Sequence, residues 1–188
     1  MNLPNKLTIL RIILIPVFLV FFFVEAIPYN YVFAAVIFCL AAFTDFLDGY
    51  LARKLGLVTN LGKFLDPIAD KVLVSTALIV LLTVPEIMPP VLGSICVAII
   101  IARELMISAF RQIAATQNVI MAADMAGKIK TVFQDLALIL MLVSCQFIES
   151  AAYPYLFYAG IALLSIATVL TLISAVNYIV KNRGVLKN

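Results

Sequence analysis

Six long runs without a charged residue constrain the fold of this chain more than any other feature. They are Ile12–Val24, Ala26–Thr44, Val72–Pro85, Ile87–Ala102, Leu136–Ile148 and Ser150–Val180. The chain has 188 residues, of which 65% are hydrophobic and 12% charged, whereas a soluble domain is nearer half apolar and a quarter charged. We therefore predict an all-α integral membrane protein with six transmembrane helices, about as many as this length allows.

The distribution of charge predicts how these helices cross the membrane. Three short connections carry only an acidic residue, namely Glu25, Glu86 or Glu149, and all 13 basic residues lie at the opposite ends of the runs. By the positive-inside rule, both termini and the two longer loops are cytoplasmic. We expect a short interfacial segment around Pro4 and Asn5, then an uncleaved first helix, and a single domain over residues 1–188.

Several of the apolar runs are too short to span a bilayer alone. A run of 13 residues covers about 20 Å as a helix, against a hydrocarbon core of about 30 Å. These helices must therefore continue into the charged segments at their cytoplasmic ends. Because ionisable side chains at that depth face a polar cavity or one another, we predict a polar cavity that faces the cytoplasm.

Four aspartates between residues 45 and 70 are the strongest candidates for chemistry. Asp45 and Asp48 are three residues apart, and Asp66 and Asp70 are four apart, so each pair shares one helix face. Two antiparallel helices would bring both pairs to one site. The chain has no histidine and only isolated cysteines, and hard oxygen ligands favour Mg²⁺, Mn²⁺ or Ca²⁺ over zinc. Ion pairs with neighbouring Lys and Arg at a solvated loop are the simpler alternative.

The same segment matches a family signature. The pattern D-x2-D-G-x2-A-R-x8-G-x3-D-x3-D is met at all of its fixed positions by Asp45, Asp48, Gly49, Ala52, Arg53, Gly62, Asp66 and Asp70. The chain therefore resembles the CDP-alcohol phosphatidyltransferases. Within that family, the segments 4–18, 102–115 and 126–131 resemble those of the phosphatidylglycerophosphate synthases.

The resemblance implies a membrane enzyme, usually a homodimer, that transfers a phosphatidyl group from CDP-diacylglycerol to an alcohol and releases CMP. It implies two divalent cations, Mg²⁺ or Mn²⁺, held by Asp45, Asp48, Asp66 and Asp70, with Asp70 also the general base. It further implies that CDP-diacylglycerol is bound at Gly49, Ala52, Arg53 and Gly62. The other expected partners are membrane lipids and not nucleic acid, and the expected location is a bacterial cell membrane.

A second group of charged residues indicates the acceptor. Arg103 and Arg111 are eight residues apart on the predicted fourth helix, and Lys128 and Lys130 begin the fifth. Four cations around one cavity suit a dianionic phosphate, and a guanidinium binds it bidentately. Glycerol 3-phosphate meets this requirement. We expect Glu104 and Asp135 to pair with these cations. Anchoring to anionic headgroups is the alternative explanation for such cations.

Two further functions are compatible with parts of the sequence. The first keeps the chemistry but changes the acceptor to phosphatidylglycerol, as in a cardiolipin synthase, or to an inositol phosphate. The second is a small transporter or ion channel in which the aspartates bind a cation. The transporter reading leaves Gly49, Ala52, Arg53 and Gly62 unexplained, and the sequence has no inverted repeat.

Overall fold

The structure is a computed structural model that describes residues 3–55, 60–116 and 125–181, and these ranges contain helices and turns without any strand. The described residues form six helices, which confirms the all-α prediction. They are α1 (Leu3–Phe23), α2 (Asn30–Leu55), α3 (Asn60–Leu81), α4 (Pro90–Thr116), α5 (Met125–Gln146) and α6 (Tyr153–Lys181).

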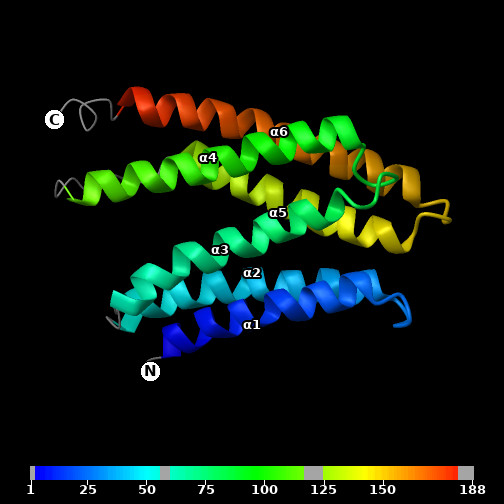
Figure 1. Cartoon of the computed structure of the whole chain (residues 1–188), viewed down its shortest axis with the longest axis horizontal. Coiled ribbons are helices and arrows are strands. Elements are labelled where there is room, and N and C mark those ends of the chain that lie inside the picture. The colour runs from blue at the N-terminus through cyan, green and yellow to red at the C-terminus, as the bar shows by residue number, and fades with distance from the viewer. Residues whose placement is uncertain (1–2, 56–59, 117–124, 182–188) are drawn as a thin grey trace.

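The helices alternate in direction. In Figure 1, α1, α3 and α5 begin at the side of the bundle where α2, α4 and α6 end. Lys6, Lys128 and Lys181 lie on the terminal turns at this side, which we call the basic end. The turns at the opposite side carry the exposed residues Glu25, Glu86 and Glu149, as the charge pattern predicted.

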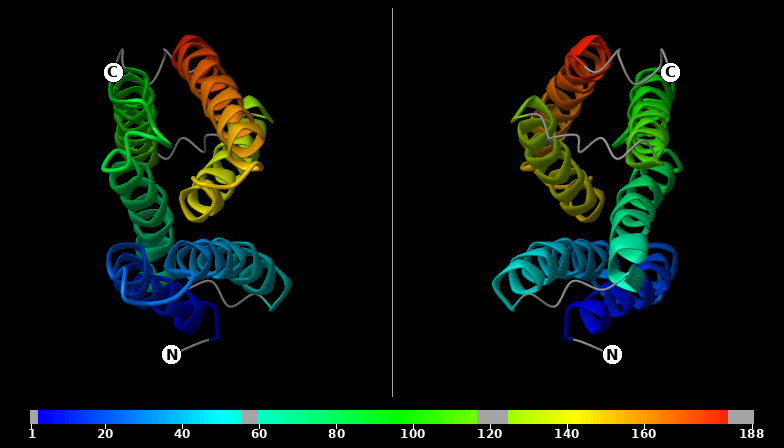
Figure 2. Two further views of the ribbon diagram at one scale, coloured as in Figure 1. Left: turned by 90° about the vertical axis from the view of Figure 1, so that its right-hand side faces the viewer. Right: turned by 90° about the vertical axis from the view of Figure 1, so that its left-hand side faces the viewer.

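The six helices contact one another in a closed ring. Its order is α1, α3, α4, α6, α5 and α2, and α3 also contacts α2 and α5. The end-on views in Figure 2 show α1 and α2 together on one side, with α3 and α4 as a second group and α5 and α6 as a third. Polar side chains that face the interior of this ring can therefore meet although they are distant in sequence.

The core of the bundle is apolar and closely packed. Phe18, Phe38, Leu78 and Leu138 are fully buried in it. Helices α5 and α6 pack tightly at Gly160, where an added Cβ would lie 2.7 Å from Cγ of Met141. Small residues at such contacts let helices pack in a membrane, where association relies on van der Waals contact.

Large apolar side chains also cover the outside of the bundle, among them Ile13, Phe33, Ile95, Leu105 and Val169. Four described segments are long and apolar enough to cross a membrane: Asn5–Phe23, Pro90–Ala114, Gly127–Gln146 and Tyr153–Lys181. The apolar part of α2, Asn30–Asp45, is shorter. An apolar surface on helices of this length identifies a membrane protein.

The N-terminus differs from the prediction in one respect. Helix α1 runs without a break from Leu3 to Phe23, so the described residues contain no separate interfacial segment before it. Pro4 is the second residue of this helix, where a missing N–H leaves no helical hydrogen bond unmade. The proline and Asn5 therefore belong to the first turn of α1.

Candidate active site

A buried arginine joins α1 to α2 in the half of the bundle near the basic end. Arg11 is fully buried, and its Nη1 lies 2.7 Å from Oδ1 of Asp45. Its Nη2 donates a 2.5 Å hydrogen bond to Oδ2 of Asp48, which is only 3% exposed. Asp45 is 46% exposed. The first aspartate pair of the signature thus faces α1 and shares one guanidinium.

A threonine one turn away links the same group to α3. The Thr8 hydroxyl donates a 2.6 Å hydrogen bond to Oδ1 of Asp66, and Oδ2 of Asp48 lies 3.5 Å from it. Thr8 and Arg11 are three residues apart and therefore share a face of α1. We call Thr8, Arg11, Asp45, Asp48 and Asp66 the carboxylate cluster, and it brings together three of the four predicted aspartates.

The fourth aspartate, Asp70, lies one turn further along α3 and lines a polar cavity between α3, α4 and α5. It is close enough to Asp45 and Arg11 to interact with their charges. The cavity encloses about 30 Å³, which is room for water but not for a substrate. Its polar lining consists of Asp70, Lys71, Ser75, Glu104, Lys130, Thr131 and Gln134.

The carboxylate cluster has the donor atoms that a hard divalent cation prefers. All of its acceptors are carboxylate or hydroxyl oxygens, the ligands typical of Mg²⁺ and Mn²⁺. Among the described residues, no three acidic or thiol side chains already converge as a complete metal site would. The cluster has three carboxylates and one guanidinium, so it keeps an excess of negative charge that a divalent cation would neutralise. The residues present therefore fit a divalent metal.

The predicted nucleotide-binding residues are described only in part. Gly49, Ala52 and Arg53 lie on the last two turns of α2, and their side-chain environments lie outside the described part of the chain. Gly62 is buried on the first turn of α3, one turn before Asp66. Their assignment to CDP-diacylglycerol stays a prediction.

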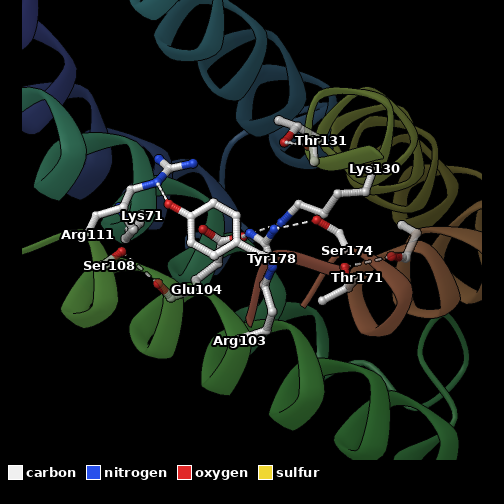
Figure 3. Close-up of polar contacts among 12 residues, drawn as sticks. Lys71, Arg103, Glu104, Ser108, Arg111, Lys130, Thr131, Thr171, Ser174 and Tyr178 are labelled. Atoms are coloured by element: carbon white, nitrogen blue, oxygen red, sulfur yellow. Dashed lines mark hydrogen bonds and ion pairs between the residues drawn. The ribbon is translucent and has the colours of Figure 1, made fainter. Parts of the chain in front are cut away.

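A second charged group lies between α4, α5 and α6, on the other side of the polar cavity (Figure 3). Oε1 of Glu104 accepts a 3.0 Å hydrogen bond from Nη1 of Arg103 and another from Nζ of Lys130. Nη2 of Arg103 donates a 2.8 Å hydrogen bond to Oγ of Ser174. We call Arg103, Glu104, Lys130 and Ser174 the cation cluster.

Burial makes this arrangement costly unless the charges are compensated. Lys130 is 3% exposed and Arg103 is 9% exposed, and the Arg103 Nε has no hydrogen-bond partner among the described residues. Gly127 leaves room beside the guanidinium, since a Cβ there would lie 3.6 Å from Nη2. Two buried cations with one shared carboxylate can accept a further anionic group.

The other two predicted acceptor residues lie apart from this cluster. Arg111, two turns further toward the basic end, is exposed and donates a 3.2 Å hydrogen bond from Nε to the Tyr178 hydroxyl. Its guanidinium carbon lies 5.6 Å from the centre of the Tyr178 ring. Lys128 is exposed and forms no ion pair with a described residue. Of the four predicted cations, Arg103 and Lys130 are therefore buried, whereas Arg111 and Lys128 lie nearer the surface.

Glu104 and Asp135 differ in their pairing. Glu104 pairs with both cluster cations, as expected. Asp135 forms no ion pair with a described residue, and its buried Oδ1 has no hydrogen-bond partner in the described part of the chain. It interacts at longer range with charged groups that include Asp70, Lys130 and Asp45. The expected pairing is therefore correct for Glu104 and wrong for Asp135.

Sequence reasoning left Thr8 and Arg11 outside the predicted site and did not identify Ser174, Tyr178 or Gln134. A usable signal exists for most of them. Thr8 and Arg11 share a face of an otherwise apolar helix, and Ser174 and Tyr178 are four residues apart on α6. Polar side chains at helical spacing inside apolar spans indicate an internal site.

Comparisons with known proteins agree with this geometry. Residues 1–180 match the model of a family described as CDP-alcohol phosphatidyltransferase. A Bacillus subtilis protein named CDP-diacylglycerol–glycerol-3-phosphate 3-phosphatidyltransferase is 40% identical to the chain, over 99% of this chain and 97% of its own length. Proteins with the same name from Salmonella paratyphi A (40% identity; 97% and 96% of the two chains) and Rickettsia bellii (39%; 94% and 93%) are similarly close.

Proposed function

Because this chain belongs to the CDP-alcohol phosphatidyltransferase family, we propose that it transfers the phosphatidyl group of CDP-diacylglycerol to sn-glycerol 3-phosphate, giving phosphatidylglycerophosphate and CMP. The names of its relatives support this donor and this acceptor. One structural observation carries the proposal: Asp70, one turn along α3 from Asp66 of the carboxylate cluster, lines the same cavity as Glu104 and Lys130 of the cation cluster. A metal-bound pyrophosphate and an anionic acceptor require two such neighbouring sites.

The proposed topology is six membrane spans with both termini and the active site on the cytoplasmic side of a bacterial membrane. The basic end of the bundle carries lysines and the other end carries only acids in its turns, which supports this orientation. CDP-diacylglycerol enters from the bilayer and glycerol 3-phosphate from the cytoplasm. We also propose, from the family resemblance, that the protein is a single-domain homodimer.

In the donor site, Asp45, Asp48, Asp66 and Asp70 would hold two divalent cations, Mg²⁺ or Mn²⁺. The bound metals would neutralise the pyrophosphate and stabilise the charge that develops on departing CMP. Arg11 and Thr8 hold Asp45, Asp48 and Asp66 in place from α1. Gly49, Ala52 and Gly62 would leave room for the cytidine group, and Arg53 would contact its phosphates.

In the acceptor site, Arg103 and Lys130 would bind the phosphate of glycerol 3-phosphate. The Glu104 carboxylate already accepts hydrogen bonds from both cations, so it lies where a phosphate oxygen can replace it. The cavity is too small for the acceptor while Glu104 lies there, so binding requires this side chain to move. Arg111 and Lys128, nearer the basic end, would attract the anion on its way in.

The proposed reaction is a single displacement at the lipid-side phosphorus of the donor. The C1 hydroxyl oxygen of glycerol 3-phosphate forms the new P–O bond, and the bond to the CMP oxygen breaks. Asp70 takes the hydroxyl proton, and CMP leaves with the electron pair of the broken bond. The position of Asp70 between the two clusters supports this role.

The acceptor is tested with purified protein, CDP-diacylglycerol and one acceptor at a time, with CMP release as the readout. We expect turnover with glycerol 3-phosphate and little with phosphatidylglycerol, while inositol phosphate, also a dianionic monoester, is the third acceptor compared. A phosphodiester lacks the second negative charge that two buried cations favour. Turnover with phosphatidylglycerol but not with glycerol 3-phosphate would replace the proposed acceptor and leave the family chemistry intact.

A further inference from the structure

Gln134 is a buried polar residue that the proposed mechanism does not yet use. It lies on α5, is 2% exposed, and lines the polar cavity. Its Oε1 is buried and has no hydrogen-bond partner among the described residues. Leaving a buried acceptor without a donor is unfavourable, so such a group usually has a partner in the functional state.

Gln134 lines the same cavity as Lys130 and Asp70, which are proposed to contact the two ends of the acceptor. Lys130 precedes it by four residues and therefore shares its face of α5. Asp70 and Lys130 both line that cavity, together with Glu104. Gln134 therefore lies one turn from the proposed phosphate-binding lysine and lines the same cavity as the proposed base.

We propose that the Gln134 side-chain oxygen accepts a hydrogen bond from the C2 hydroxyl of the acceptor. The inference rests on the proposed function, which directs the phosphate to Arg103 and Lys130 and the C1 hydroxyl to Asp70. Because Gln134, Lys130 and Asp70 line one cavity, the carbon between those two ends can lie beside Gln134. Its hydroxyl supplies the donor that the buried carboxamide oxygen lacks. Gln134 is thus a specificity-determining residue for a glycerol phosphate.

The physical consequence is discrimination against acceptors without that hydroxyl. The suitable analogue is 3-hydroxypropyl phosphate, which retains the phosphate and the attacking hydroxyl and lacks only the C2 hydroxyl. Bound to the wild-type protein, it leaves the Gln134 oxygen buried without a donor. We expect kcat/KM for the analogue to be about 10- to 100-fold below that for glycerol 3-phosphate.

The test compares both acceptors in the wild type and in Gln134→Leu, which has a similar volume and no acceptor atom. We expect Gln134→Leu to lower kcat/KM for glycerol 3-phosphate about 10- to 100-fold and to leave the analogue unchanged or improved. Where the analogue turns over too slowly, its inhibition constant against glycerol 3-phosphate replaces kcat/KM. An equal loss with both acceptors would indicate a purely structural role and overturn the proposal.

Gln146 provides a matched control on the same helix. It is the last residue of α5, about 18 Å further along, and its Oε1 is also buried without a partner in the described residues. Gln146→Leu should leave the ratio between the two acceptors unchanged, and a shift as large as that of Gln134→Leu would overturn the assignment. If Gln134→Leu fails to fold, Gln134→Asn serves, because its shorter carboxamide should also lose activity selectively with glycerol 3-phosphate.

The failure of this inference is distinguishable from failure of the proposed function. If the wild type turns over glycerol 3-phosphate and no Gln134 variant changes the ratio, only the role of Gln134 is wrong. If the wild type releases no CMP with glycerol 3-phosphate, the acceptor assignment fails, and the inference that rests on it fails as well.

Discussion

The carboxylate cluster and the cation cluster have opposite arrangements of charge. In the first, the fully buried Arg11 contacts two aspartates, and a third is held through Thr8. In the second, a single carboxylate, Glu104, receives hydrogen bonds from an arginine and a lysine. Three aspartates against one arginine leave two negative charges, whereas two cations against one glutamate leave one positive charge. Each cluster thus retains an excess that a ligand of opposite sign would neutralise.

The two clusters also differ in which charge is free to move. Arg11 and Asp48 are almost completely buried, so their contact is part of the packing between α1 and α2. Glu104 is 23% exposed and is the most accessible member of its ion pairs. The difference suggests a fixed donor site, into which cations are added, and an acceptor site in which one carboxylate is displaced. The following predictions test that contrast, beginning with the largest effect.

The largest effect is expected at Asp70, the residue between the two clusters. Asp70→Asn removes the proposed proton acceptor and one charge of the proposed metal ligands while keeping the side-chain size. We expect kcat to fall by about 10³-fold or more, because general base catalysis alone supplies about 10²- to 10⁴-fold. CMP release under saturating substrates measures the change. Asp135→Asn, a nearby acid outside the signature, is the control and should change kcat far less.

Retained turnover in Asp70→Asn would remove Asp70 from the mechanism. An equal loss in Asp135→Asn would show that any buried negative charge in this region has the same effect. In either case, Asp70 would not be the specific proton acceptor of the reaction.

The second prediction concerns stability and the fixed nature of the carboxylate cluster. Arg11→Met removes the buried partner of Asp45 and Asp48, and breaking a buried ion pair in this way costs about 3–5 kcal/mol. We expect a marked fall in the unfolding midpoint of the purified protein in detergent. The double variant Arg11→Met/Asp48→Asn should recover part of the loss, because it removes an uncompensated carboxylate.

Additive losses in that double variant would show that Arg11 and Asp48 are not energetically coupled. Arg11 would then contribute to packing only. The carboxylate cluster would no longer differ from Glu104 by having a fixed ion pair.

The third prediction concerns the cation cluster and the acceptor. Lys130→Met should raise KM for glycerol 3-phosphate about 10- to 100-fold, since a hydrogen bond to a charged group contributes about 1.5–3 kcal/mol. KM for CDP-diacylglycerol should change little. Lys181→Met, which removes an exposed lysine at the end of α6, is the matched control for the loss of one positive charge. A rise confined to the KM of CDP-diacylglycerol would assign Lys130 to the donor site.

The smallest effect is expected for Glu104→Gln. The amide keeps a hydrogen-bonding group between Arg103 and Lys130 but removes a charge that competes with the phosphate. We expect KM for glycerol 3-phosphate to fall about fivefold, a change of about 1 kcal/mol. Steady-state kinetics at fixed ionic strength gives the value. A higher KM would mean that Glu104 positions the two cations for binding and is not displaced.

Local spacing accounts for what could be predicted from the sequence. The aspartate pairs share helix faces because three- and four-residue spacings do so in any helix. Gly56 favours a helix end and Asn60 is a capping residue, so they predict a connection around Leu55–Asn60, and α2 ends at Leu55 while α3 begins at Asn60. The apolar runs predicted the helices themselves, because a surface in contact with lipid needs no alternation of polar residues.

The parts of the site that the sequence did not predict depend on packing between segments far apart in the chain. The contacts of Arg11 with Asp45 and Asp48, and of Arg103 with Ser174, join different helices of the ring. No periodicity along one helix specifies which neighbour it meets. The place of Gln134 in the site is not predictable from α5 alone for the same reason, since its burial in the cavity depends on packing of α3 and α4 against α5.

The most direct test of the account is the metal dependence of CMP release by the purified protein. With CDP-diacylglycerol and glycerol 3-phosphate both present, we predict that CMP is released with Mg²⁺ or Mn²⁺, stops on addition of EDTA, and resumes when the metal is restored. Omission of either substrate should also prevent release. No CMP release under these conditions, or release that persists in EDTA, would contradict the account and favour a different role for the acidic site, such as cation transport.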